Sequence, residues 1–260
     1  MTNLIIRLFE DWGEITLNRP EQRNAFDAGI IAELIEVLQD WALKPELRYL
    51  VLKGAGSHFS AGADLEWMRR MASAPQQENI QDAKQLASLF REFYNFPVPT
   101  LVRVQGAAMG GALGLVACAD TVVASDQARF SLSELRLGLA PAVISPYLHR
   151  AIGPRALSHL ALSARVFDAA EARHFGLIHR IVAPENLDEA ILQECAHLRL
   201  TAPLASRACK RLLRSQAPAP DPELEQSTAH LIADLRISRE GQEGLAAFFA
   251  HQRPSWQEES

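Results

Sequence analysis

The spacing of apolar and polar positions changes along the chain and predicts strands that alternate with helices. Residues 4–9 and 14–18 have the short apolar runs of two strands, and residues 11–13 would form the turn of a hairpin. Apolar residues then recur at helical spacing over residues 30–41, and Asp27 precedes them where a helix cap is expected. The N-terminal region therefore predicts a hairpin followed by an amphipathic helix.

Three further apolar runs have the pattern of buried strands. They cover residues 49–53, 101–105 and 121–124. A helical pattern of apolar positions lies between the first two of them, over residues 76–95. Strands that alternate with helices favour an α/β fold over a sandwich or a bundle.

Beyond about residue 190 the strand patterns stop, and the chain reads as helices. The predicted helices cover residues 187–200, 203–213, 224–237 and 241–251. We therefore expect a core over residues 1–190 and a helical region over residues 191–260. A helical region that cannot bury its own apolar face usually packs on a partner subunit, so we expect a homo-oligomer.

Composition restricts the class of protein and its partners. With 260 residues, of which 48% are hydrophobic and 22% charged, the chain can bury a full core without disulfides. Its formal net charge of −5 gives no basic field that would attract nucleic acid or an anionic membrane. The three cysteines fit no disulfide framework, the eight histidines have no metal-binding spacing, and we find no secretory or transmembrane pattern. We expect a cytoplasmic protein that binds no metal, nucleic acid or membrane.

Two glycine-containing segments concentrate the candidate chemistry. HFSAGADLEWM at 58–68 and GAAMGGALGLVACAD at 106–120 each follow a strand and lead into a helix. The amides near Ala63, and those of Gly110 and Gly111, would then lie at helix N-termini. Two N–H groups that converge on one oxygen form an oxyanion hole, which stabilises a carbonyl as it gains negative charge. The other interpretation is that these glycines only permit tight turns.

These two segments, with NRPEQRNAF at 18–26 and EGLAAFFAHQRPSW at 243–256, resemble the crotonase superfamily of enoyl-CoA hydratases and isomerases. The four segments stand in the family's order and at its approximate spacing, so the resemblance covers essentially the whole chain. It implies a spiral of ββα repeats with a C-terminal helical trimerisation region, assembled as a homotrimer or a dimer of trimers. It also implies a CoA thioester whose carbonyl lies between the N–H groups of Ala63 and Gly111. Coenzyme A would enter as part of this acyl-CoA substrate, and no cofactor would be bound permanently.

The resemblance also assigns binding roles to further positions. The CoA-binding positions that it implies are Arg23, Asn24, Ala25, Ala61, Asp64 and Leu65. The substrate-binding positions are Gly110, Gly114, Arg136 and Met68. Met68 belongs to a stretch with Trp67 and Met71 that either lines the acyl pocket or packs in the core.

The acid–base residues depart from the family's hydratase pattern. Hydratases of the family generally carry two catalytic glutamates, and the resemblance places Gly114 where the first would stand. The second falls on Glu134, in ARFSLSELRLGLAP, and an apolar acyl pocket should raise the pKa of its carboxyl. Without the resemblance, a glutamate in S-x-S-E would read as an ordinary helix-cap residue.

Other departures concern the substrate. The segment from Pro141 to Pro146 replaces a glycine-rich family motif, so the acyl pocket should differ. Together with Gly114, this region is similar to bacterial hydratases of branched glutaconyl-CoA esters, the 3-methylglutaconyl-CoA and isohexenylglutaconyl-CoA types. Such substrates carry a second carboxylate, which Arg136 would reach if residues 134–136 were extended; a surface arginine is the alternative. His251 stands where the family often has a CoA-binding lysine, which puts contact with a neighbouring subunit's CoA in question.

Three functions follow from these observations. The first is an enoyl-CoA hydratase that adds water to a 2-enoyl-CoA, in which Ala63 and Gly111 stabilise the enolate and Glu134 moves the proton. The second is an enoyl-CoA isomerase, because one carboxylate can carry a proton between the α and γ carbons without activating water. The third is a CoA-ester binding protein without catalytic activity.

Overall fold

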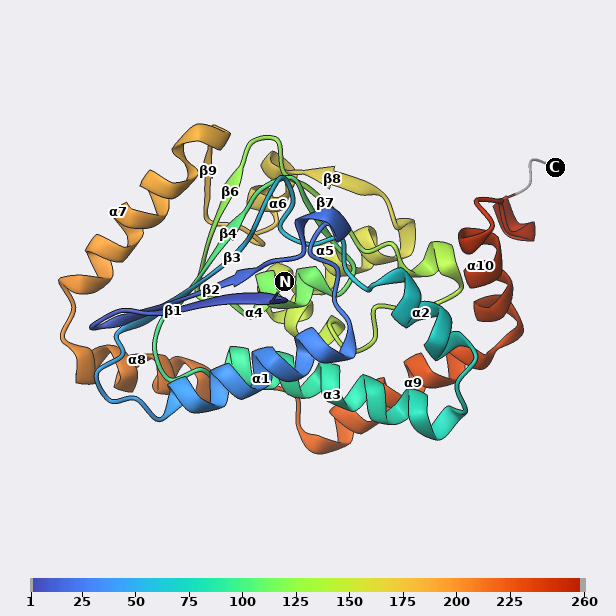
Figure 1. Ribbon diagram of the computed structural model, residues 1–260, viewed down its shortest axis with the longest axis horizontal. Coiled ribbons are helices and arrows are strands. Elements are labelled where there is room, and N and C mark those ends of the chain that lie inside the picture. The colour runs from blue at the N-terminus through green and yellow to red at the C-terminus, as the bar shows by residue number, and fades with distance from the viewer. Residues whose placement is uncertain (1, 258–260) are drawn as a thin grey trace.

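The computed structural model describes residues 2–257 and has a mixed α/β architecture, in which a twisted sheet is flanked by helices (Figure 1). The main sheet has six strands in the order β1-β2-β3-β4-β6-β9. Only β1 runs antiparallel to its neighbour; the other pairs are parallel. The strands of this sheet are β1 (Leu4–Leu8), β2 (Trp12–Leu17), β3 (Tyr49–Gly54), β4 (Thr100–Val104), β6 (Thr121–Ser125) and β9 (Arg180–Val182). The predicted buried strands are therefore confirmed.

The predicted N-terminal hairpin is confirmed, but its turn was placed too late in the sequence. Leu8 pairs with Gly13, so Trp12 and Gly13 already belong to β2. The amide of Phe9 donates to the carbonyl of Trp12 over 2.9 Å, and their rings stack with centroids 4.1 Å apart. This aromatic contact holds Trp12 in the extended conformation of a strand.

A second, three-stranded sheet completes the spiral of ββα repeats. Its strands are β5 (Ala107–Met109), β7 (Arg129–Ser131) and β8 (Val166–Asp168), in the order β5-β7-β8. The chain places β4 in the large sheet and β5 in the small one before helix α4, and then repeats this with β6, β7 and α5. In the first of these repeats, the end of β5 leads directly into the start of α4, and in the second the end of β7 leads into the residues that carry Glu134.

The helical patterns predicted at 30–41 and 76–95 are confirmed, and helices follow both glycine-containing segments as expected, whereas the two helices between residues 145 and 174 were not predicted. The α-helices of the core are α1 (Ala28–Ala42), α2 (Leu65–Ala72), α3 (Gln76–Tyr94), α4 (Ala112–Cys118), α5 (Ser145–Ser163) and α6 (Ala169–His174). Short 3-10 helices are η1 (Pro20–Gln22), η2 (Glu134–Leu137), η3 (Pro184–Asn186) and η4 (Ser255–Gln257). Asp27 caps α1 as predicted, because its carboxylate accepts from the amide of Ile30 at 2.9 Å.

The C-terminal part consists of α7 (Leu187–Arg199), α8 (Pro203–Gln216), α9 (Pro222–Ile237) and α10 (Arg239–Phe249). Helix α7 packs on β4 and β6, whereas α9 packs along α3 and α10 packs against η2. These helices therefore bury part of their surface on the same chain. The predicted boundary at residue 190 stays a prediction.

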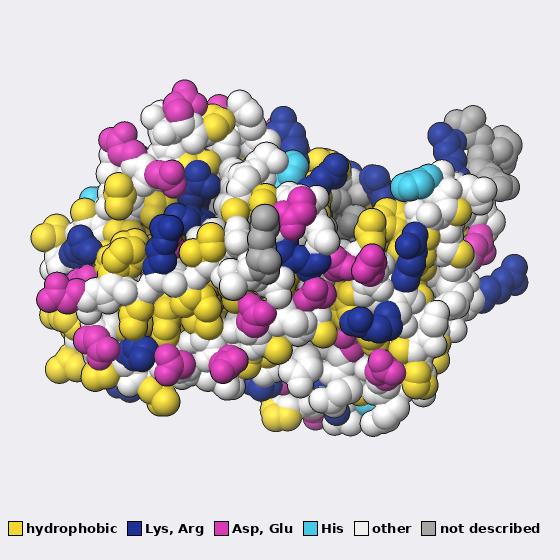
Figure 2. All heavy atoms as spheres, in the orientation of Figure 1, with side chains coloured by type: hydrophobic (Ala, Val, Ile, Leu, Met, Phe, Trp, Pro, Cys, Tyr) yellow, Lys and Arg dark blue, Asp and Glu magenta, His cyan; other side chains and the backbone are white. Residues whose placement is uncertain are grey.

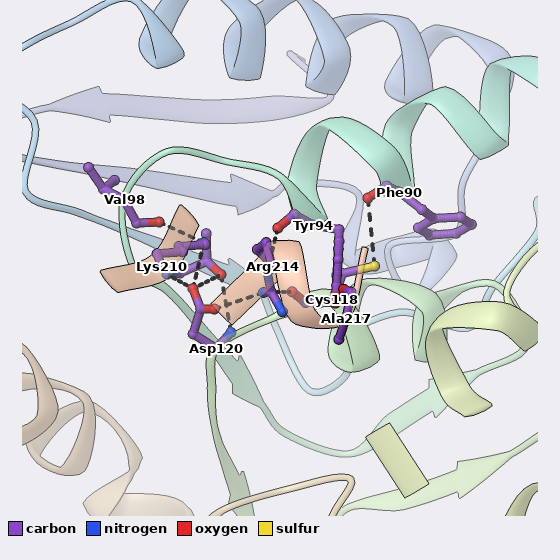
Figure 3. A network of polar contacts seen from close by, with 9 residues as sticks. Phe90, Tyr94, Val98, Cys118, Asp120, Lys210, Arg214 and Ala217 are labelled. Carbon is purple, nitrogen blue, oxygen red and sulfur yellow. Dashed lines mark hydrogen bonds and ion pairs between the residues drawn. The ribbon is translucent and has the colours of Figure 1, made fainter. Parts of the chain in front are cut away.

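A network of charges attaches α8 to the main sheet (Figure 3). The Lys210 ammonium is buried and lies 2.6 Å from Oδ2 of Asp120 and 2.8 Å from the carbonyl of Val98. Arg214 binds the other oxygen of Asp120 at 2.7 Å and stacks on the ring of Tyr94, 3.7 Å from its centroid. Burial lowers the pKa of Lys210 to about 8, although Asp120 opposes this effect by favouring the charged form.

Hydrophobic side chains gather on the face that carries α7, α8 and the β1–β2 hairpin (Figure 2). Among them, Leu200 and Leu204 are more than 80% exposed. None of the helices in residues 2–257 is both long and apolar enough to cross a membrane.

Candidate active site

A cavity of about 1050 Å³ lies between the two glycine-containing loops, η2 and the C-terminal helices. Its wall includes residues from α2 and α3 of the core and from α9 and α10. Among the predicted residues, those that line it are Arg23, Ala25, Ala61, Ala63, Asp64, Leu65, Met68, Gly110, Gly111, Glu134 and Arg136. Asn24 and Gly114 do not.

The first loop leaves one backbone amide free in the cavity wall. The amide of Gly62 donates to the Ser60 hydroxyl at 3.1 Å, and that of Asp64 donates to the Phe26 carbonyl at 2.7 Å. Between them, the amide of Ala63 has no acceptor among residues 2–257. The neighbouring hydrogen bonds fix the peptide planes on both sides, so the Ala63 N–H is held in place without a partner of its own.

The second loop has the same arrangement. Gly110 has a φ of +51°, which favours glycine, and its amide donates to the Ser131 carbonyl at 2.9 Å. Gly111 caps the start of α4, and its amide has no acceptor within the described part of the chain. The two free N–H groups, of Ala63 and Gly111, therefore lie in the wall of one cavity. A ligand oxygen that reached both would have the surroundings of an oxyanion hole.

Glu134 places a carboxyl group beside the second loop. A Cβ atom at Gly110 would lie 3.3 Å from its Oε1, so the carboxyl lies against the Gly110 backbone. Its Oε2 is buried and has no hydrogen-bond partner in residues 2–257. This burial raises the pKa of Glu134 from 4.5 to about 7, so its carboxyl is balanced between the protonated and ionised forms near neutral pH.

Gly114, predicted to bind substrate, is buried in the core behind the cavity. A Cβ atom there would lie 2.6 Å from Cε1 of Phe90 and 2.7 Å from Cγ2 of Ile144. These two side chains fill the space that a larger residue would need. Gly114 therefore lies outside the cavity wall, and its lack of a side chain permits close packing of α4.

On the predicted CoA side of the cavity, Asn24 also has a structural role. Its side-chain amide donates to the carbonyls of Ala55 and His58, both at 2.8 Å, and its oxygen accepts from the Arg19 amide. Asn24 is buried and joins two loops without touching the cavity. The predicted segment lines the cavity through Arg23 and Ala25, but its sequence does not show which of its side chains face the cavity.

Asp64 lines the cavity, but its carboxylate already has partners. One oxygen accepts from the amides of Glu66 and Trp67 at the start of α2, and the other lies 3.2 Å from Arg19. It therefore orders the first loop and the helix that follows.

Arg136 lines the cavity, but the extended conformation that would bring it to the same side as Glu134 is absent. Residues 134–137 form a 3-10 helix, so Glu134 and Arg136 do not share a face as they would in a strand. Arg136 is exposed. Met68 lines the cavity, whereas Met71 is buried in the core.

The sequence did not predict that the C-terminal helices of the same chain line the cavity. Ile232 and Arg236 from α9 do so, as do Leu245 and Phe248 from α10. His251, for which contact with a neighbouring subunit's CoA was left open, lines the cavity of its own chain. No signal local to α9 or α10 indicates which core elements they cover.

Two other residues have no role in the cavity wall. His58 accepts a hydrogen bond from the Ala107 amide at 3.0 Å, which joins the first loop to β5. Burial raises the pKa of the Cys118 thiol, so it stays protonated. No cluster of metal-binding side chains occurs in the part of the chain that the structure describes.

Comparisons with known proteins agree with this geometry. Residues 11–259 match the enoyl-CoA hydratase/isomerase family model. A crystal structure of an enoyl-CoA hydratase from Shewanella pealeana is 42% identical, with a TM-score of 0.80 over 98% of this chain and 96% of that one. A Thermus thermophilus protein, named as a candidate enoyl-CoA hydratase, is 34% identical over 92% of this chain and 95% of its own. The 2,3-dehydroadipyl-CoA hydratase of Escherichia coli is 30% identical over 98% of this chain and 99% of its own.

Proposed function

Because the chain belongs to the enoyl-CoA hydratase/isomerase family, we propose that it adds water to a 2-enoyl-CoA of the branched glutaconyl type. As an enzyme of this family, it acts on a CoA thioester. The observation that carries the hydratase proposal is the pair of free amides, Ala63 and Gly111, in one cavity wall with the carboxyl of Glu134.

In the proposed reaction, the thioester oxygen accepts hydrogen bonds from the amides of Ala63 and Gly111. Addition at the β carbon sends electron density through the double bond to this oxygen, so that an enolate forms. Fixed N–H groups bind the enolate oxygen more strongly than the neutral carbonyl, which lowers the barrier. Arg23, Ala25, Ala61 and Leu65 are proposed to bind the CoA part of the substrate.

Glu134 is proposed to carry the proton in both directions. As a carboxylate it takes one proton from water while the water oxygen bonds to the β carbon. It then returns this proton to the α carbon, so that the elements of one water molecule are added and the carboxylate is regenerated. A pKa of about 7 suits both steps, because neither form of the carboxyl is strongly preferred.

The proposed substrate carries a second carboxylate. Its support is the region from Pro141 to Pro146, which departs from the family's glycine-rich motif, and the similarity to a relative named 2,3-dehydroadipyl-CoA hydratase. Ala142, Val143 and Ile144 line the cavity and give this end an apolar wall. A branched acyl chain would contact more of this apolar wall than a short linear chain would.

Isomerisation is the second candidate function, and the packing at Gly114 favours it. Phe90 and Ile144 exclude a second glutamate from that position, so no partner carboxylate from α4 can hold a water molecule. A single carboxyl at Glu134 would be enough to move a proton between the α and γ carbons.

One experiment separates the two reactions. The pure protein is incubated with 3-methylglutaconyl-CoA, crotonyl-CoA and a 3-enoyl-CoA, and the products are resolved by mass. A hydratase adds one water to the first or second ester, whereas an isomerase changes no mass. Conversion of the 3-enoyl ester alone would contradict the hydratase proposal.

We also propose a cytoplasmic homotrimer or dimer of trimers. Leu200 and Leu204 remain highly exposed in the single chain, and Leu231 of α9 and Phe248 of α10 are partly exposed. Apolar faces of this kind are usually covered in oligomers. Light scattering that gives a stable monomer would contradict the assembly.

A further inference from the structure

We infer that Arg236 binds the distal carboxylate of a dicarboxylic acyl group, so that this arginine on α9 sets the preference for acidic acyl chains. The inference rests on the proposed function, because it assigns one end of the same cavity. It differs from the interpretation of the sequence, which placed the cation at Arg136.

The location of Arg236 is the first observation that supports it. Arg236 lines the cavity together with Ile232 from its own helix, and its guanidinium lies 6.0 Å from the ring centroid of Trp67. Ala83 and Leu86 of α3 line the same cavity. The apolar wall that these residues form is suited to an acyl chain rather than to a nucleotide, and Arg236 adds a positive charge to it.

The hydrogen bonds of Arg236 are incomplete on one side. Its Nη1 donates to Oδ1 of Asn79 at 3.1 Å and to Oδ2 of Asp82 at 2.8 Å. Its Nη2 and Nε have no acceptor among residues 2–257. A guanidinium binds a carboxylate best through two parallel N–H groups, and Nη2 and Nε are such a pair.

Burial distinguishes Arg236 from the other arginines at the cavity. Its side chain is 14% exposed, and that of its partner Asp82 is 9% exposed. Arg23 and Arg136 are both exposed. A half-buried guanidinium with unused donors binds an anion more tightly than an exposed one, because less water competes for it and less salt screens it.

Asp82 has a dual effect that makes the inference testable. It holds Arg236 in place, and it accepts from Nε1 of Trp67 at 2.9 Å, but its charge also opposes a second carboxylate nearby. Asp82→Asn keeps an oxygen for Trp67 and removes that opposing charge. Arg236→Met keeps much of the apolar length of the side chain and removes the cation.

The experiment compares saturated esters that cannot react, so its result does not depend on turnover. Binding of glutaryl-CoA and butyryl-CoA is measured by calorimetry for the wild-type protein, Arg236→Met, Asp82→Asn and Arg136→Met. Arg239→Met is the matched control, since Arg239 is exposed, three residues away and outside the cavity wall.

We expect the wild-type protein to prefer glutaryl-CoA, and Arg236→Met to lower that preference by about 10- to 100-fold. Asp82→Asn should raise the preference, whereas Arg136→Met and Arg239→Met should leave it within about 3-fold. A purely structural role for the Arg236–Asp82 pair predicts that the two variants weaken both esters alike, which would overturn the inference.

Equal binding of the two esters by the wild-type protein would also overturn it. Loss of the preference in Arg136→Met but not in Arg236→Met would assign the carboxylate to Arg136 instead. If the wild-type protein bound neither ester, the proposed function itself would fail, and crotonyl-CoA turnover distinguishes that case.

Discussion

Replacement of Glu134 by glutamine should make the enzyme more stable at neutral pH while it removes most of the activity. The carboxyl is buried, and burial raises its pKa from 4.5 to about 7. Glutamine has nearly the same shape and no charge to bury. The Glu134→Gln protein should therefore be more stable than the wild-type protein at every pH at which the wild-type carboxyl must ionise in the cavity.

The magnitude follows from the two pKa values. Below about pH 4.5 the carboxyl is protonated in both the folded and the unfolded chain, so it does not disfavour folding. Between pH 4.5 and about 7 the unfolded chain releases its proton first, and the stability of the wild-type protein falls as the pH rises. Above pH 7 the loss levels off at about 3 kcal/mol, because one pKa unit corresponds to about 1.4 kcal/mol. Glu134→Gln has no such loss.

The assay is urea denaturation of both proteins at pH 5, 6, 7 and 8, at one protein concentration because assembly adds to apparent stability. The gain of Glu134→Gln over the wild-type protein should grow across this range to about 2 to 3 kcal/mol. Glu66→Gln, an exposed carboxylate in the same cavity wall, controls for the loss of one negative charge. A constant difference between Glu134→Gln and the wild-type protein at all four pH values would refute the reasoning.

Measurements of enzyme activity test whether Glu134 carries the proton. The kcat of Glu134→Gln should fall by about two to four orders of magnitude while CoA-ester binding remains. In the wild-type protein, kcat/KM for hydration should rise with pH through about 7 and then level off, because Glu134 must be ionised to accept a proton. If Glu134→Gln kept most of its activity on every ester tried, the proton carrier would be another group.

Three further changes test the rest of the structure. Gly111→Pro should lower turnover by about two to three orders of magnitude. Gly111 already has a φ of −53°, which proline can adopt, so the change acts by removing the backbone N–H. Gly111→Ala keeps this N–H and should retain activity well above the proline variant. In urea denaturation, Gly114→Ala should cost about 1 to 3 kcal/mol by overpacking. Gly29→Ala, at an exposed position of α1 where the new Cβ would meet only Oδ1 of Asp27 at 3.3 Å, should change the free energy of unfolding by less than about 1 kcal/mol. Asp120→Asn should lower the free energy of unfolding by about 3 kcal/mol at pH 7, because the buried Lys210 loses its carboxylate; equal urea midpoints would show that the pair contributes nothing.

The sequence predicted the larger strands and helices because each has a clear pattern of apolar residues. The strand Tyr49–Gly54 is a nearly continuous apolar run, and the helix Ala28–Ala42 is long enough to show the helical period. The strands β5, β7 and β8 have three residues each, which is too short for an alternation to appear. Their pairing depends on residues distant in sequence, such as Phe130 beside Phe167, and no local pattern indicates it.

The candidate site likewise contains residues that a local motif indicates and residues whose positions depend on distant packing. The glycine motifs and the family resemblance indicated Ala63 and Gly111, and both residues line the cavity in loops whose neighbouring amides are hydrogen-bonded. Asn24 and Gly114 lie outside the cavity wall because of what packs beside them: Ala55 and His58 for the first, Phe90 and Ile144 for the second. Arg236 was missed because α9 reaches the cavity through its packing on α3, α2 and α10, which no local pattern indicates.

The contact between η2 and α10 shows why the pKa of Glu134 cannot be predicted from its own motif. Any side chain at Gly244 would overlap the backbone of Leu137, three residues after Glu134, and one at Gly138 would overlap the backbone of Glu240. The 3-10 helix that carries Glu134 thus packs backbone to backbone against a helix about one hundred residues later in the chain. Burial raises the pKa of Glu134, and the position of η2 that produces this burial depends partly on α10. The register of one motif can identify the acid–base residue, but its proton affinity is a property of two distant segments together.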